Sequence, residues 1–198
     1  MDLLSKPKKD LEIALSEISK MKSAKTFNQF LENWENFLFR IDRCGDVTGI
    51  ILENQVKDYG QWKKPYAKLR KKEPLLKYLK QARNAEMHGI SESVSASSGI
   101  EIEDKTGRGM QIKAIEYTLK EGLLEINLKT NDLFTDVNVK LMPIDPKLVK
   151  VQNRSKWYNP PKTYLGNKID DLHPISIAEI GYKFYKSYIS DAERWLNK

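Results

Sequence analysis

The chain has few of the residues that build covalent or metal-stabilised folds. Cys44 is the single cysteine among 198 residues, so an internal disulfide and a zinc site built from several thiolates are both excluded. Only two histidines are present. The carboxylates are numerous, but none of their spacings is typical of a glycosidase pair or a metal cluster. We therefore expect no metal and no cofactor.

Long apolar runs are also missing. No stretch approaches the roughly 20 apolar residues of a membrane span, and residues 1–6 lack the apolar segment of a signal peptide. The hydrophobic fraction of 40% is nevertheless enough for a core. We expect a cytoplasmic protein without a membrane segment, built as one domain or as one domain with a sizeable insertion.

The formal net charge is +7, which favours polyanionic partners. Positive charge gathers in residues 62–72, where Trp62 and Tyr66 lie among lysines, and it continues beyond that segment. Such a pattern suits contacts to a nucleic-acid backbone together with base stacking. It equally suits a solvated helix face whose aromatic residues point inward. The candidate nucleic-acid-binding residues are Lys63, Lys64, Lys68, Arg70, Lys71, Lys72 and Lys80.

Residues 1–90 show the apolar spacing of helices. One helix is predicted around residues 11–21. A second should start at a capping box formed by Thr26 and Gln29 and end at Gly45. One or two helices, interrupted near Gly60, are expected in residues 47–72. Pro74 suits the first turn of a further helix, which Gly89 should terminate.

The pattern changes after residue 90. Residues 91–99 are small and predict a mobile loop, and from about residue 100 apolar residues alternate with polar ones. Strands are predicted at 112–119, 124–128, 137–141 and 147–151, with turns at residues 105–109, 121–122 and 131–132. Another basic and aromatic group, Trp157, Tyr158, Lys162 and Tyr164, falls in a predicted loop over residues 157–174, where loop packing explains it best.

A last helix is predicted to start at a capping box of Ser176 and Glu179, and His173 should have a structural role. The chain is thus expected to be α+β, a helical bundle with a small antiparallel β-sheet inserted before the C-terminal helix. Its parts are a bundle over 1–90, an inserted β region over 91–156, and a loop with the closing helix over 157–198.

The segment 81–89 carries the strongest functional signal. It holds Arg83, Asn84 and His88 at the end of a predicted helix. Histidine transfers protons near neutral pH, and arginine binds phosphate in a bidentate manner. On an ideal helix Asn84 and His88 lie one turn apart, whereas Arg83 and His88 point about 140° apart.

Arg83 falls on the apolar side of this helix together with Glu86. These two residues could form an intrahelical pair at the rim of the core, or Arg83 could face a polar cleft or a partner. His88 could be only a helix cap. As an imidazolium favoured by the negative end of the helix dipole, it could also act as a general acid or a phosphate ligand.

The segment resembles the motif of HEPN domains, helical bundles marked by an arginine, often followed by a polar residue, and then a histidine. Here four residues separate Arg83 from His88, and Asn84 follows the arginine. The resemblance implies a metal-independent endoribonuclease and a homodimer in which two motif helices form one cleft. The resemblance is compatible with a toxin or an antiviral defence effector, for which an antitoxin or a nucleotidyltransferase could be a further partner.

The resemblance also implies how the catalytic residues would act. The two His88 side chains would serve as base and acid, Arg83 would stabilise the phosphoryl oxygens, and Asn84 would orient His88 or the phosphate. Two alternatives stay open because members of this family can lack catalysis: a non-catalytic RNA-binding module on the same fold, and a scaffold whose inserted strands bind a partner protein.

Overall fold

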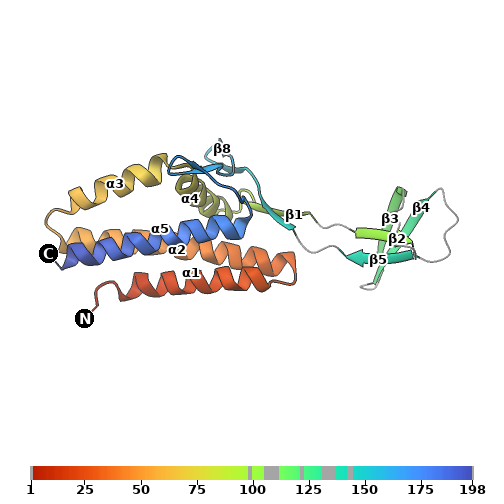
Figure 1. The fold of residues 1–198 in the computed structure, drawn as a ribbon, viewed down its shortest axis with the longest axis horizontal. Helices are drawn as coiled ribbons and strands as arrows, with labels where there is room; N and C mark the ends of the chain where they lie inside the picture. Colours follow the sequence, from red (N-terminus) through yellow and green to blue (C-terminus); the bar gives the residue numbers. More distant parts are fainter. Residues whose placement is uncertain are drawn as a thin grey trace. The chain divides into compact units, whose positions relative to one another are not determined.

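The computed structural model describes residues 2–97, 100–104, 112–120, 123–130, 137–141 and 145–197 (Figure 1). The chain divides into two compact units. One comprises Met1–Ser97 and Pro146–Lys198, and the other comprises Ser98–Asp145. The first unit is helical and the described part of the second consists of β-strands. The expected α+β class, with antiparallel strands inserted before the C-terminal helix, is confirmed.

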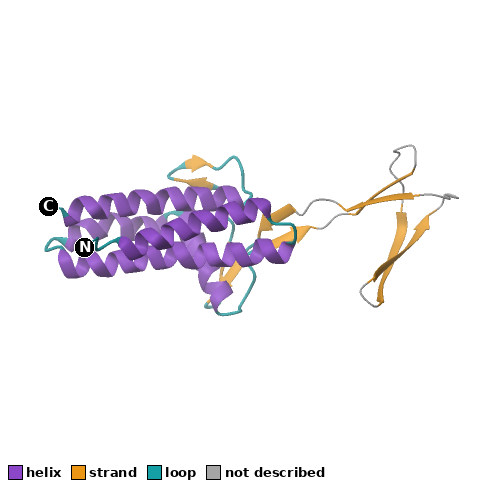
Figure 2. Cartoon of the chain, turned by 90° about the horizontal axis from the view of Figure 1, so that it is seen from below, coloured by secondary structure: helices purple, strands orange, loops and turns teal. Residues whose placement is uncertain are grey.

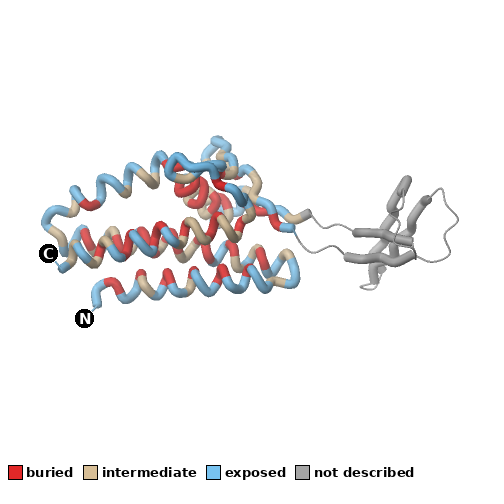
Figure 3. The backbone as a smooth tube through the Cα atoms, in the orientation of Figure 1, coloured by how far each residue is buried: buried red, intermediate tan, exposed pale blue. Residues whose placement is uncertain are grey.

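The described part of the first unit contains five helices together with short strands. Long helices lie alongside one another in it (Figure 2), and α1, α2 and α5 pack mutually. Buried positions recur along these helices (Figure 3). The core that they form includes Trp34, Phe37, Ile177 and Tyr188. The helices are α1 (Ser5–Ser23), α2 (Phe27–Gln55), α3 (Tyr59–Lys72), α4 (Pro74–Met87) and α5 (Pro174–Leu196).

The second helix does not end at Gly45, so that prediction is wrong. α2 continues through Gly45 and Gly49 to Gln55, and α3 then starts at Tyr59. Gly45 serves close packing instead, because a Cβ at this position would lie 2.7 Å from Tyr185 Cε1. Continuing the helix also buries Leu52, and this burial outweighs the low helix propensity of the two glycines.

The helix starts are partly as predicted. The Thr26 hydroxyl accepts a hydrogen bond from the backbone N–H of Gln29 at 3.2 Å. The Ser176–Glu179 capping box is wrong: α5 begins at Pro174, and His173 Nδ1 accepts from Ile175 N at 3.2 Å. His173 is therefore a structural helix cap. Ser176 instead donates a hydrogen bond to the Asp171 carboxylate, and Glu179 forms an ion pair with Lys22.

Short strands accompany the helical unit. β1 and β6 pair with each other, β7 and β8 form an antiparallel pair, and so do β9 and β10. Residues 94–97, expected in a mobile loop, form β1, and the strand expected at 147–151 is divided between β6 and β7. The strands are β1 (Val94–Ser97), β6 (Asp145–Leu148), β7 (Val151–Asn153), β8 (Lys156–Tyr158), β9 (Thr163–Tyr164) and β10 (Asn167–Lys168).

The second unit contains two antiparallel pairs among its described residues. β2 (Ile100–Asp104) pairs with β5 (Val137–Leu141). β3 (Ile112–Lys120) pairs with β4 (Leu123–Thr130), and this register shifts between Ile112 and Ala114. The period-two alternation thus identified β3, β4 and β5 correctly, whereas no strand was predicted at the position of β2. The turns predicted at residues 105–109, 121–122 and 131–132 lie outside the described residues.

A buried polar cluster holds together the two chain segments that lead to and from the insert. Ser93 Oγ accepts from Trp34 Nε1 at 2.8 Å and donates to Glu86 Oε1 at 2.5 Å. The Tyr78 hydroxyl lies 3.0 Å from the Ser93 carbonyl oxygen and 2.6 Å from that of Val149. Burial raises the pKa of Tyr78, so the hydroxyl stays a donor. These contacts fix the chain directly after α4.

Candidate functional site

The end of α4 fixes the position of His88. Pro74 occupies the first turn as predicted, and the helix ends one residue before His88, which is its C-cap. Gly89 has φ +58, and its N–H donates to the Glu86 carbonyl oxygen at 3.0 Å. Ile90 N donates to the Ala85 carbonyl oxygen at 3.0 Å. These two bonds form a Schellman motif, which needs the left-handed glycine. His88 is held there with its side chain exposed.

His88 lines a groove with a volume of about 450 Å³. The groove lies between α4 and the β7–β8 hairpin, and none of the described residues that line it is acidic. A histidine, two cations and several amide groups therefore share one small space, which suits an anionic ligand. The lining residues are Gln81, Asn84, His88, Asn153, Arg154, Lys156 and Tyr158.

The hairpin places Arg154 beside His88. Arg154 and Ser155 both have positive φ, 47° and 62°, as in a type I′ turn. Neither is glycine, so the turn carries a small conformational cost. The hairpin is fastened to α4 because Asn153 Nδ2 donates to Gln81 Oε1 at 2.6 Å.

Arg83 does not line this groove. Its Nε lies 3.1 Å from Asp42 Oδ2 on α2, an ion pair without hydrogen-bond alignment. Its Nη1 donates to Asn84 Oδ1 at 3.1 Å. Of the two alternatives for Arg83, the intrahelical pair with Glu86 is not formed, and Glu86 instead accepts a hydrogen bond from the backbone N–H of Ser93 at 2.6 Å. Arg83 therefore holds the side-chain oxygen of Asn84, a residue that also lines the groove.

Asp42 is a buried carboxylate, 3% exposed, surrounded by cations. Lys80 Nζ lies 2.6 Å from its Oδ1, and Arg70 Nη2 lies 3.3 Å from the same oxygen. Arg70 also pairs with the exposed Asp46 at 3.2 Å. Lys80 and Arg70 are candidate nucleic-acid ligands, but both already form ion pairs with carboxylates of the protein.

The other basic residues of α3 are exposed. Trp62 is buried, and its ring centroid lies 4.9 Å from that of Tyr188 on α5. Tyr66 donates its hydroxyl to Asp191 at 2.9 Å. The alternative of a solvated face with inward aromatics therefore describes α3, and stacking on Trp62 is excluded. The lysines available to a phosphate backbone are Lys63, Lys64, Lys68, Lys71 and Lys72.

Sequence reasoning missed Arg154 and Lys156. The segment 153–156, Asn-Arg-Ser-Lys, carried a turn signal between apolar Val151 and Trp157, but no strand was predicted after it. Trp157 on the same hairpin is 55% exposed, with Lys150 Nζ 4.6 Å from its ring centroid. Tyr158, expected to serve loop packing, contributes to the groove.

The described residues contain neither a candidate metal site nor a candidate membrane-spanning helix. No group of three or more histidine, cysteine or carboxylate side chains there is arranged to hold a metal ion. Within the same residues, no helix has both the length and the apolar character needed to cross a bilayer.

No family model, no curated protein and no solved structure matches this chain. The resemblance to HEPN domains therefore rests on Arg83, Asn84, His88 and their helix, and it stays a prediction.

Proposed function

We propose that the protein is a metal-independent endoribonuclease of the HEPN type, acting on single-stranded RNA. The observation that carries the proposal is the groove beside His88, which joins an exposed histidine to Asn84, Arg154 and Lys156 without a carboxylate among its described lining residues. A phosphodiester fits these charges, and imidazole is the side chain best suited to move protons near neutral pH.

The reaction uses the ribose 2′-hydroxyl as the nucleophile. One His88 removes the proton of this hydroxyl, and the 2′-oxygen attacks the adjacent phosphorus. The bond from phosphorus to the 5′-oxygen breaks, and a second imidazole protonates that oxygen. The products are a 2′,3′-cyclic phosphate and a free 5′-hydroxyl. In a homodimer the second imidazole is His88 of the other copy, as the resemblance implies.

The groove suggests that the phosphate is bound by residues other than Arg83, the arginine of the motif. We assign Arg154 and Lys156, which line the groove, to hold the phosphoryl oxygens, where charge grows in the transition state. Arg83 is a positioning residue, because it contacts Asn84 and Asp42 and does not line the groove. Asn84 directs an amide N–H towards the phosphate or the imidazole.

The test is cleavage of end-labelled single-stranded RNA in excess EDTA by the wild type, His88→Ala and His173→Asn. The wild type and His173→Asn should cleave, since asparagine is also a good N-cap acceptor, and His88→Ala should not. Equal cleavage by all three would indicate a contaminating nuclease. Loss of activity on chelation alone would contradict a metal-independent mechanism.

A second candidate function is RNA binding without catalysis. The exposed lysines of α3 favour it, because they can bind phosphates without any help from His88. Binding would then weaken steeply with salt and would survive His88→Ala. A protein that binds RNA in this way and never cleaves it would replace the ribonuclease proposal.

A further inference from the structure

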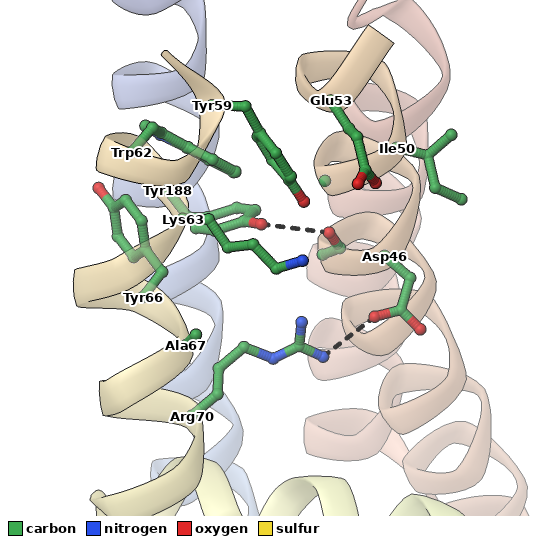
Figure 4. Close-up of a pocket in the computed structure, with 12 residues that line it drawn as sticks. Asp46, Ile50, Glu53, Tyr59, Trp62, Lys63, Tyr66, Ala67, Arg70 and Tyr188 are labelled. Atoms are coloured by element: carbon green, nitrogen blue, oxygen red, sulfur yellow. Dashed lines mark hydrogen bonds and ion pairs between the residues drawn. The ribbon is translucent and has the colours of Figure 1, made fainter. Parts of the chain in front are cut away.

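A second pocket lies between α2 and α3, with α5 behind it (Figure 4). Its volume is about 390 Å³, near the lower end of the range of about 300–1,000 Å³ found for small-molecule sites. It shares no lining residue with the groove of His88. It can therefore hold a small ligand independently of that groove.

One side of this pocket is aromatic. The ring centroids of Tyr66 and Tyr188 lie 4.8 Å apart, and those of Trp62 and Tyr188 lie 4.9 Å apart. Tyr59 stacks on Trp62 at 5.9 Å, and its hydroxyl points towards α2 (Figure 4). Trp62 and Tyr188 are buried and pack behind Tyr59 and Tyr66, whose rings are partly exposed and favour a flat, conjugated ligand.

The opposite wall is the bare backbone of α2 at Gly45 and Gly49. Gly45 is required by packing, because a Cβ there would lie 2.7 Å from Tyr185 Cε1. Gly49 is not required in this way. Its Cβ would meet the Tyr59 hydroxyl at 3.5 Å, an ordinary contact. Gly49 lines the pocket, so a side chain longer than that of alanine at this position would occupy its space.

The rim carries both signs of charge. Glu53 and Asp46 come from α2, and Lys63 and Arg70 come from α3 (Figure 4). Lys63 Nζ lies 5.0 Å from the Tyr59 ring centroid. Arg70 uses Nη2 for the carboxylates, while its Nη1 lies 3.6 Å from the position of a Cβ on Gly45. The carboxylates can accept hydrogen bonds from donor groups on a polar ring, and the two cations can bind an anion attached to that ring.

We propose that the α2–α3 pocket binds a nucleotide whose base carries an exocyclic amine. The base lies against the partly exposed rings of Tyr59 and Tyr66 and the glycine backbone of α2. Its amine donates to Glu53, and the phosphate contacts Lys63 and Arg70. The nucleotide is either free or an unpaired residue of an RNA strand. The site does not depend on the proposed ribonuclease activity, so each can fail without the other.

Calorimetric titration at low salt tests this with two matched ligands, AMP and purine riboside 5′-monophosphate, which lacks the amine. AMP should bind saturably and about tenfold more tightly, the value of one hydrogen bond to a charged group. Glu53→Ala should remove that preference, whereas Glu32→Ala, an exposed carboxylate elsewhere on α2, should keep it. His88→Ala should leave binding unchanged.

Further variants locate the ligand. Lys63→Gln should weaken both ligands, and Lys9→Gln, an exposed lysine of α1 outside the pocket, should not. Gly49→Leu should fill the pocket and abolish binding while helicity by circular dichroism is retained. Binding of a short oligoadenylate alone, with the same pattern of variants, would identify RNA as the source of the nucleotide.

The proposal is overturned if neither AMP nor the oligoadenylate binds saturably up to tens of millimolar. It is also overturned if Glu53→Ala and Lys63→Gln both leave the affinities unchanged, since the ligand would then lie elsewhere.

Discussion

Arg83 Nε lies 3.1 Å from Asp42 Oδ2, so the arginine of the motif joins α4 to the buried carboxylate of α2. The same guanidinium donates to Asn84 Oδ1 at 3.1 Å. A loss of activity on changing Arg83 would therefore combine two effects, a weaker α2–α4 contact and a loosened Asn84. Stability and activity must be measured on the same variant to separate them.

Replacing Asp42 should destabilise the protein strongly. Asp42→Asn removes the carboxylate shared by Arg70, Lys80 and Arg83, and breaking a buried ion pair by losing one partner costs about 3 kcal/mol or more. Asp46→Asn removes an exposed carboxylate of the same cluster and should cost less than about 1 kcal/mol. Urea unfolding followed by circular dichroism measures both; equal losses would contradict the burial of Asp42.

Arg154→Ala should lower kcat on RNA by about a hundredfold, as loss of a donor to developing phosphoryl charge does in other enzymes. Its free energy of unfolding should change little because no intramolecular ion pair of Arg154 is seen in the described residues. Lys9→Ala, which removes an exposed lysine of α1 outside the groove and outside the basic face of α3, is the matched control. An Arg154→Ala variant with wild-type kcat would remove this residue from the proposed site.

The two glycines of α2 should respond in opposite directions to the same substitution. Gly49→Ala should stabilise the protein by up to about 1 kcal/mol, since alanine favours the helix and its Cβ finds room. Gly45→Ala should destabilise it by about 1–3 kcal/mol, because its Cβ would overlap Tyr185. Thermal unfolding of both variants measures the difference, and a stabilising Gly45→Ala would show that α5 does not pack as described.

Alkaline pH should weaken the fold partly through Tyr66. Burial, and then the hydrogen bond to Asp191, raise the pKa of Tyr66 to about 12 from the ordinary value of 10.0. A raised folded-state pKa stabilises the protein fully below pH 10, and the stabilisation is lost as pH rises from about 10 towards 12. Tyr66→Phe should reduce the slope of unfolding free energy against pH in this window. An unchanged slope would contradict this role of Tyr66 and would mean that other tyrosines cause the pH dependence.

The residues also show how far the sequence could lead. Alternation identified β3, β4 and β5 of the insert, and Pro74 and Gly89 marked the ends of the motif helix, because these signals are local. Gly45 packs against Tyr185, which lies far away in the chain, so no local signal showed that α2 continues past this glycine. The partner of Arg83 and the position of Arg154 likewise depend on tertiary packing of α2 and the hairpin against α4, so helix geometry alone could only separate Arg83 from His88.

The most direct test of the central claim is cleavage of an oligodeoxynucleotide that contains one ribonucleotide, in EDTA, by the wild type and His88→Ala. The account predicts that the wild type cuts only after the ribose, leaving a 2′,3′-cyclic phosphate, and that His88→Ala leaves the strand intact. Equal cleavage by His88→Ala, or cleavage of the all-deoxy strand by the wild type, would contradict the claim that His88 activates a ribose hydroxyl.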